Sequence, residues 1–505
     1  MTRSPHEAAL SELRIGGASF AVIYLVLLCL VAPLLIVAFE DGAYSVLAAT
    51  IGLALAFLAM FEMRRVGHPL TPAGIAAIGG ILIFALRPIT VQSSGYTTPG
   101  ALLDSRTFVG PTVDAGVASL GQVATFYAAF GVCYFLIQAR RRVAANTMKL
   151  NALCFSETTV RRAGLILVFV TIFAVGCAVL LVQSSGGLAA HFSGVSVRSS
   201  FLAGRYYLTL GYLPLTVALV MYVLVRRFAG LREWNGGALL AAAVLVAVGF
   251  TTGGRGPLLL GVILPILILK QTGPSRFTAR TLTLIGGGLL VGAMTMSLFL
   301  REGVYDEGAS IRALQANPLG TLMERLTSGA ETRPFDSLIL LNEVDAAGQV
   351  PWLFGRTYAA VPTWFVPGDL IPWKDGGANT WFTREYVPRF YYPDKIETSI
   401  SAIGEAYANF RWVGIVVVGV LVAVAAAKLS VRRSGDGFMK TTTIAVLTPL
   451  FFSFIRGDAF QNLSTVILIL AFIGLFRAGL GRLKVGEGVL PAVRMRPAKP
   501  SPQPV

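Results

Sequence analysis

Long apolar runs recur along almost the whole chain, separated mostly by short polar segments. A bilayer core of about 30 Å needs roughly 20 apolar residues in a helix. The pattern predicts an all-α polytopic membrane protein of about twelve transmembrane helices. The seventh and eighth runs are short and joined by a glycine-rich turn, so two half-buried helices are an equal alternative there. The runs cover residues 18–39, 43–62, 70–90, 118–139, 163–183, 207–225, 236–251, 256–270, 281–300, 406–428, 440–457 and 461–477.

Composition excludes an ordinary soluble enzyme. Of the 505 residues 55% are hydrophobic and 13% charged, with a mean hydropathy of +0.69, whereas soluble domains average about 25% charged residues. The four cysteines lie far apart and the chain holds only three histidines. We therefore expect neither a disulfide framework nor a metal site.

The charge distribution predicts the orientation. The chain carries 42 Lys and Arg against 26 Asp and Glu, a formal net charge of +16, and such an excess can indicate a nucleic-acid partner. With a cytoplasmic N-terminus, however, the cytoplasmic segments hold 26 of the basic residues and only seven of the acidic ones. This is the positive-inside pattern of membrane proteins. We expect both termini in the cytoplasm and no nucleic-acid partner.

One connection is much longer than the others. Residues 1–300 contain helices 1–9 with short loops, 301–405 form a large outer loop, 406–480 contain helices 10–12, and 481–505 are a cytoplasmic basic tail rich in proline. The loop is rich in tryptophan, tyrosine and proline, which predicts a folded cap at the headgroup level of the membrane. A helix is expected from Thr332-Arg333-Pro334, with Thr332 as its N-cap.

Arginines on the outer side are the first candidates for chemistry, because the orientation rule disfavours them there. A guanidinium near hydrocarbon usually pairs with a carboxylate or lines a wet cavity, and its planar fork suits phosphate oxygens. Several of them together would bind a lipid diphosphate. The alternative is that each pairs with a nearby carboxylate: Arg456 with Asp458, Arg333 with Asp336, and Arg411 with Glu405. The outer arginines include Arg87, Arg198, Arg205, Arg255, Arg301, Arg333, Arg356, Arg411 and Arg456.

Carboxylates are the candidate proton acceptors. Neither face carries an Asp-x-Asp pair, which argues against a metal-dependent nucleotide-sugar site, and the outer His191 is expected to be a solvated loop residue. Glu405 stands out because it lies where the long loop re-enters the membrane, although a helix N-terminal carboxylate with no catalytic role is an equal alternative. The other candidates are Asp336, Asp458 and Glu331.

Two segments carry a family resemblance. Thr252-Gly-Gly-Arg-Gly-Pro-Leu-Leu259 resembles a recurrent segment of bacterial O-antigen polymerases of the Wzy type, also called oligosaccharide repeat unit polymerases. Residues 403–414 resemble the family's Gly-Glu-x-Tyr-x-Asn-Phe-Gly signature, except that Arg411 stands where glycine is usual. The segments 333–336, 355–358 and 371–374 lie between them in a familiar order.

The resemblance implies a GT-C-like membrane glycosyltransferase in the bacterial inner membrane, with its active site on the periplasmic side. It implies polymerisation of undecaprenyl-diphosphate-linked oligosaccharide repeat units into a surface polysaccharide. Because the donor's leaving group is already a diphosphate, no metal, nucleotide or other cofactor is expected. The expected partners are the undecaprenyl-diphosphate-linked donor and acceptor and membrane lipid, and a chain-length regulator protein is a further candidate.

Combined with the residues, the resemblance gives a hypothesis for the site. Glu405 is the first-choice catalytic base and Asp336 the second. Diphosphate binding is assigned to Arg198, Arg205, Arg255, Arg333 and Arg456. Orientation of the sugars or phosphate is assigned to Tyr407, Asn409, Lys374, Arg356 and Arg411.

Two alternatives stay open. An O-antigen ligase would have a related architecture and donor, but that family is expected to carry a functional histidine in the large outer loop, and residues 301–405 contain none. A transporter or flippase of lipid-linked oligosaccharide would favour internal repeats and polar groups near the midplane of the bilayer. Here no half-to-half repeat is evident, and polar residues concentrate at the outer rim.

Overall fold

In a computed structural model of the chain, every regular element of the described residues is a helix. The described residues are 19–38, 43–66, 68–89, 113–140, 155–188, 190–191, 206–252, 316–317, 333–366, 370, 376–388, 392, 397–430 and 438–481. The elements are η1 (Leu27–Val31), α2 (Ala32–Ala38), α3 (Ala43–Val66), α4 (Pro72–Gly80), η2 (Ile81–Leu86), α6 (Val113–Arg140), α7 (Glu157–Ser184), η4 (Tyr206–Gly211), α10 (Tyr212–Phe228), α11 (Gly236–Thr251), α17 (Arg333–Ala346), α18 (Arg356–Ala359), η6 (Val361–Thr363), α19 (Ala378–Tyr386), α21 (Ser401–Ser430), α22 (Phe438–Leu447), α23 (Leu450–Arg456) and α24 (Ala459–Leu480).

Within these ranges nine helical stretches are long and apolar enough to cross a membrane, which confirms a polytopic all-helical membrane protein. The run at 236–251 forms α11, whose 16 residues are short for a complete span. The runs expected at 256–270 and 281–300 lie outside the described residues, so the count of twelve stays a prediction. The nine are Ser19–Val37, Tyr44–Val66, Pro72–Ile89, Asp114–Ala139, Glu157–Ser184, Tyr207–Phe228, Ser401–Ser430, Phe438–Arg456 and Ala459–Leu480.

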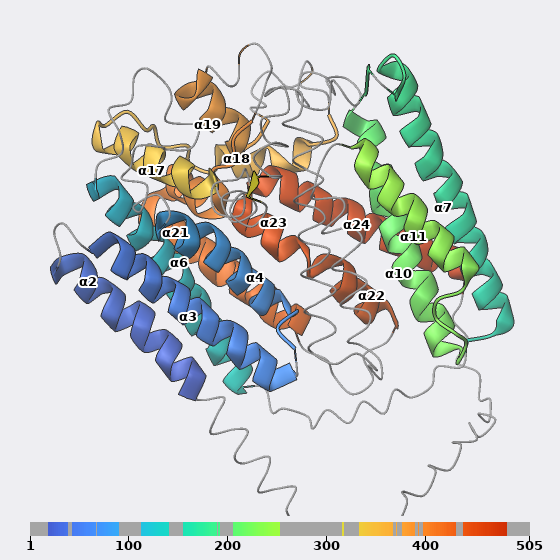
Figure 1. The fold of residues 1–505 in the computed structure, drawn as a ribbon, viewed down its shortest axis with the longest axis horizontal. Helices are drawn as coiled ribbons and strands as arrows, with labels where there is room; N and C mark the ends of the chain where they lie inside the picture. The colour runs from blue at the N-terminus through green and yellow to red at the C-terminus, as the bar shows by residue number, and fades with distance from the viewer. Residues whose placement is uncertain are drawn as a thin grey trace, which may run out of the picture.

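The long helices pack in two groups (Figure 1). In the first group, α3 packs against α2, α4 and α6, and α21 packs against α4 and α6, with the most extensive contact between α6 and α21. In the second group, α7, α10 and α11 pack with α22 and α24. The short helix α23 contacts α4, α21 and α24 and so joins the groups. Helices α17, α18 and α19 lie together over one end of the bundle, at the top of Figure 1.

Helix α17 is fixed to the spans by both polar and aromatic contacts. It begins at Arg333 with Pro334 in its first turn, as the sequence predicted. The buried side chain of Asn342 donates hydrogen bonds to Ser119 Oγ (3.0 Å) and Gln122 Oε1 (3.1 Å) of α6. The ring of Phe335 packs at 6.4 Å from that of Phe84. Because a satisfied buried polar network fixes relative position, α17 forms part of the scaffold beneath the cap.

Helix α21 is broken near its N-terminal end. It begins at Ser401, earlier than the expected start at residue 406, and its backbone departs from helical angles at Phe410 and Arg411. A side chain at Gly414 would overlap the carbonyl oxygen of Ala406, so the break requires glycine at this position. The short part, 401–409, meets the cap, whereas the longer part continues through the bundle beside α6.

Candidate functional site

Glu405 is a buried carboxylate at which three elements meet. Its side chain is supplied by the short part of α21, and the residue is 1% exposed. Oε1 accepts a hydrogen bond of 2.6 Å from Thr357 Oγ1 of α18, and Oε2 accepts one of 2.6 Å from the backbone N–H of Ala459, the first residue of α24. A carboxylate has about four lone-pair sites, so these two donors leave acceptor capacity on both oxygens.

Asn409 orients the donor to Glu405. It lies one turn further along α21, and its Nδ2 donates to Thr357 Oγ1 and to the Glu405 carbonyl, both at 2.8 Å. Both bonds are donated by Nδ2 of Asn409, so the amide cannot be flipped and its Oδ1 has one orientation. The Thr357 hydroxyl then accepts from Asn409 and directs its own hydrogen to Glu405. The three side chains therefore form one ordered relay.

Two buried polar atoms next to this relay make no hydrogen bond to any described residue: Asn409 Oδ1 and the hydroxyl of Tyr358. Tyr358 follows Thr357 in α18, and its ring is stacked on that of Phe410 at 6.3 Å and 1°. Tyr358 is half-buried, and its hydroxyl is buried. Burial raises the pKa of the Tyr358 hydroxyl, and the charges of Glu405 and Asp458 raise it further. Buried polar groups are normally satisfied, so these atoms are candidates for binding a ligand.

Asp458 caps two helices at once. As the N-cap of α24, it accepts from the Gln461 N–H at 3.0 Å through Oδ1, and Oδ2 accepts from the Asn379 N–H of α19 at 2.9 Å. Gly377 permits this approach, because its φ is +103° and a Cβ there would lie 2.7 Å from Asp458 Oδ2. Burial raises the pKa of the Asp458 carboxyl, while the backbone donors act in the opposite direction. The partly positive N-termini of both helices thus face this carboxylate.

The second candidate base, Asp336, is held by an arginine from the end of the third span. Arg87 Nε and Nη2 donate to the two Asp336 oxygens at 2.9 and 2.8 Å, and both residues are 2% exposed. Burial raises the pKa of Asp336, whereas the charges of Arg87 and Arg333 lower it. The bidentate pair is a well-defined ionic contact, and it fastens α17 to the bundle.

Arg411 occupies a backbone conformation that strongly favours glycine, with φ +55° and ψ −145°. Its Nη1 lies 2.6 Å from Asp345 Oδ1, and Tyr407 donates to the other oxygen of Asp345 at 2.7 Å. The guanidinium also lies over the rings of Tyr407 and Trp352, at 5.1 and 5.6 Å. A glycine at position 411 could not make these side-chain contacts, which offset the strain of the Arg411 backbone. They account for an arginine at the glycine position of the signature.

The Arg411 backbone gives a stability prediction. Arg411→Ala removes the side-chain contacts and keeps the strain, whereas Arg411→Gly removes both. We expect the glycine variant to be more stable than the alanine variant by about 1–3 kcal/mol, although glycine in a regular helix is normally the less stable by about 1 kcal/mol. Thermal unfolding of the purified variants in detergent measures the order. An alanine variant as stable as the glycine variant contradicts the strained backbone.

The structure brings part of the predicted site together. Glu405 and Asn409 form the relay with Thr357, Arg356 directly precedes Thr357 in α18, and Arg456 lies two residues before Asp458. Arg333 lies near Asp336, and Tyr407 and Arg411 contact Asp345. The predicted residues Arg198, Arg205, Arg255 and Lys374 lie outside the described residues.

Some expectations were wrong. His191 is buried, not solvated: its ring nitrogens lie 3.1 Å from Ser185 Oγ and 2.7 Å from the Thr251 carbonyl oxygen. The expected pairing of Glu405 with Arg411 is replaced by hydrogen bonds to Thr357 and Ala459. Sequence reasoning also missed Thr357, Tyr358 and Asp345. The first two lay in the motif at 355–358 without an assigned role, whereas nothing local marked Asp345.

Residues 387–479 match the family model described as O-antigen polysaccharide polymerase Wzy. The resemblance to Wzy-type polymerases is thereby confirmed over this C-terminal stretch, which contains Glu405, Asn409, Arg411 and Asp458. The chain matches no curated protein and no solved structure. Together with the membrane-spanning helices, the match indicates a Wzy-type membrane protein of polysaccharide biosynthesis, and at this level an enzyme.

Proposed function

We propose that this protein is a membrane glycosyltransferase that joins undecaprenyl-diphosphate-linked oligosaccharide repeat units into a surface polysaccharide. The Wzy match over residues 387–479 and the spanning helices support the reaction class. A GT-C-like architecture, with a cap over one end of the helices, is part of the same proposal. Neither a nucleotide nor a metal takes part in the proposed step, because the donor carries its own diphosphate leaving group.

The observation that carries the proposal is the buried, oriented carboxylate of Glu405 within the matched segment. Thr357 and the Ala459 N–H hold both of its oxygens, and Asn409 fixes the direction of the Thr357 hydroxyl. A general base has to reach the proton that it removes at hydrogen-bond distance. The free acceptor capacity of Glu405, beside Asn409 Oδ1 and the Tyr358 hydroxyl, suits an incoming sugar hydroxyl.

In the proposed step, the acceptor hydroxyl oxygen attacks the anomeric carbon of the donor glycan. The bond between that carbon and the diphosphate oxygen breaks, and the lipid diphosphate leaves with the electron pair. The hydroxyl proton passes to Glu405. Asn409 Oδ1 and the Tyr358 hydroxyl bind the sugar, and cationic groups stabilise the leaving diphosphate. For that last role we propose the predicted diphosphate-binding residues Arg198, Arg205, Arg255, Arg333 and Arg456. We add Arg356, which directly precedes Thr357 in α18.

Glu405 suits the role of base better than the other two carboxylates. Both oxygens of Asp336 accept from Arg87, and an ion pair of this kind disfavours proton uptake. Both oxygens of Asp458 accept from backbone N–H groups that begin helices. In Glu405 only Oε2 accepts from an N–H that begins a helix, whereas Oε1 accepts from the side-chain hydroxyl of Thr357. Glu405 also lies beside Asn409 Oδ1 and the Tyr358 hydroxyl, which make no hydrogen bond to the part of the chain that the structure describes.

The placement of basic residues supports an extracytoplasmic site in the inner membrane. Glu405 lies near the N-terminal end of α21, and Lys428 lies in the last turn of that helix. Asp458 begins α24, whose last turn carries Arg477. In both helices the basic residue therefore lies at the end opposite the carboxylate, as the positive-inside rule requires if Glu405 and Asp458 face outward. Cytoplasmic termini and a chain-length regulator as partner stay predictions.

Purified protein incubated with undecaprenyl-diphosphate-linked repeat units, without nucleotide or divalent metal, tests the proposal. We expect a ladder of lipid-linked products that differ by whole repeat units. Transfer only to a different acceptor would identify a ligase instead. Movement of the substrate across vesicles without new glycosidic bonds would identify a transporter, and either result would overturn polymerisation.

A further inference from the structure

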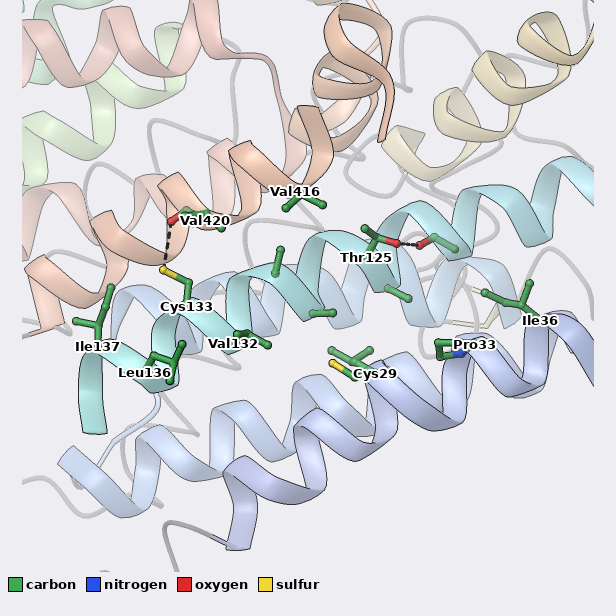
Figure 2. A pocket seen from close by; sticks show the side chains of 15 residues that line it. Cys29, Pro33, Ile36, Thr125, Val132, Cys133, Leu136, Ile137, Val416 and Val420 are labelled. Atoms are coloured by element: carbon green, nitrogen blue, oxygen red, sulfur yellow. Dashed lines mark hydrogen bonds between the residues drawn. The ribbon is translucent and has the colours of Figure 1, made fainter. Parts of the chain in front are cut away.

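A groove runs along the bundle between the first span, α6 and α21 (Figure 2). Its volume is about 690 Å³, within the range of pockets that bind small molecules. All three walls belong to stretches that are long and apolar enough to cross a membrane. The groove is lined by Leu28, Cys29, Pro33, Ile36, Gly121, Ala124, Thr125, Ala128, Ala129, Val132, Cys133, Leu136, Ile137, Val416 and Val420.

The walls of this groove suit hydrocarbon and no polar ligand. The hydroxyl of Thr125 donates to the Gly121 carbonyl at 2.8 Å, one turn back in its own helix, and the Cys133 thiol lies 3.9 Å from the Val420 carbonyl oxygen. Both contacts are drawn in Figure 2. The remaining lining side chains are apolar. An occupant therefore gains by burying apolar surface and finds no group that would bind a headgroup.

Small residues of α6 keep the groove open. Gly121, Ala124, Ala128 and Ala129 stand where longer side chains would fill the space between the first span and α21. A Cβ added at Gly121 would lie 3.6 Å from Ile36 and 3.8 Å from Trp412, which are ordinary contact distances. A larger side chain can thus be introduced there without a backbone clash, and it would extend into the groove.

One end of the groove lies toward the cap, because Asn342 of α17 bonds to Ser119 and Gln122 of α6, on either side of Gly121. Trp412 faces Gly121 at that end and also packs edge-on against Tyr407, with ring centroids 6.1 Å apart. Tyr407 lies between Glu405 and Asn409 in α21, the same helix that supplies Val416 and Val420 to the groove. A lipid tail in the groove would therefore place its headgroup at the cap-side end of α21, which is the end that carries Glu405.

We propose that this groove holds the isoprenoid tail of the lipid-diphosphate substrate, an inference that rests on the proposed function. The diphosphate has to reach Glu405 while its tail stays in hydrocarbon. The groove offers an apolar path inside the spanning segments, and its Gly121 end lies at the cap-side end of the bundle, as Glu405 does. An ordinary phospholipid chain is the competing occupant, and the experiment below distinguishes it.

Gly121→Leu and Ala128→Leu fill the groove, and Gly176→Leu is the matched control, because nothing lies within 4 Å of a Cβ at that position of α7. We expect the filled variants to raise KM for undecaprenyl-linked repeat units by about tenfold with kcat little changed, because binding in the ground and transition states is lost equally. With substrate on a two-isoprene tail, wild type and filled variants should have the same KM. The control should match wild type with both substrates.

Photo-crosslinking with a photoreactive polyprenyl diphosphate that carries no sugar gives a readout without turnover. We expect labelled peptides from α6 and α21, less labelling in the filled variants than in Gly176→Leu, and competition by polyprenyl phosphate but not by phospholipid. Equal competition by phospholipid, unchanged labelling in the filled variants, or an equal rise of KM for both tails overturns the inference. Wild-type labelling without any product ladder would instead count against the proposed function, so the two failures are distinguishable.

Discussion

Glu405→Gln should reduce elongation by about 10²- to 10⁴-fold, the contribution typical of a positioned general base, and leave most substrate as single repeat units. The amide keeps the size of the side chain and one acceptor oxygen for Thr357 or Ala459, but it cannot take up the proton of the acceptor hydroxyl. Product ladders from purified protein measure the loss. The substitution also leaves one buried hydrogen bond unmade, so we expect a free energy of unfolding lower by only about 1–3 kcal/mol.

Glu397→Gln is the matched control for this variant. Glu397 precedes the same helix, and its carboxylate accepts from the Thr380 hydroxyl at 2.6 Å in a partly buried contact. Burial raises the pKa of Glu397 to about 7, so the control removes a carboxylate of similar surroundings that is not bonded to the relay. The control should elongate normally. Full-length ladders from a folded Glu405→Gln protein would remove Glu405 from the chemistry. Equal losses of activity in both variants would point to a general effect of changing a carboxylate in this region.

The sequence predicted best those features that depend on neighbouring residues along the chain. Apolar runs of sufficient length predicted the spanning helices because the bilayer imposes their length. The start of α17 at Arg333 followed from a proline in the first turn. Glu405 was selected because it lies where the chain returns to hydrocarbon, and the structure places it in a buried relay.

The partners of these residues could not be predicted in the same way. One alternative from the sequence paired Asp336 with the neighbouring Arg333, whose charge does act on it, but the bidentate partner of Asp336 is Arg87, 249 positions away along the chain. The same alternative paired Arg411 with Glu405, but the guanidinium binds Asp345, 66 positions away. Side chains pair according to the packing of helices, and no periodicity within one helix encodes which other helix lies beside it. The break in α21 was missed for a related reason, since Arg411 replaces the glycine that would have marked it.

Breaking the Arg87–Asp336 pair should have the largest effect on stability. We expect Asp336→Ala to lower the free energy of unfolding by about 3–5 kcal/mol, because it leaves a buried guanidinium without its carboxylate. The double variant Arg87→Met with Asp336→Leu removes both charges and keeps apolar volume at the contact between η2 and α17. Such replacements are often neutral or stabilising, so the double variant should regain most of the lost stability in thermal unfolding.

The same double variant separates structure from chemistry at Asp336. If the pair only fastens α17 to the third span, a folded double variant should still produce a ladder of repeat units. If it unfolds at the wild-type temperature but leaves single repeat units, Asp336 or Arg87 acts in the reaction, and the assignment of Glu405 as the base has to be revised. A double variant as unstable as Asp336→Ala would show instead that the two charges do not form a separable pair. The relay around Glu405 contains neither residue, so we expect the folded, active result.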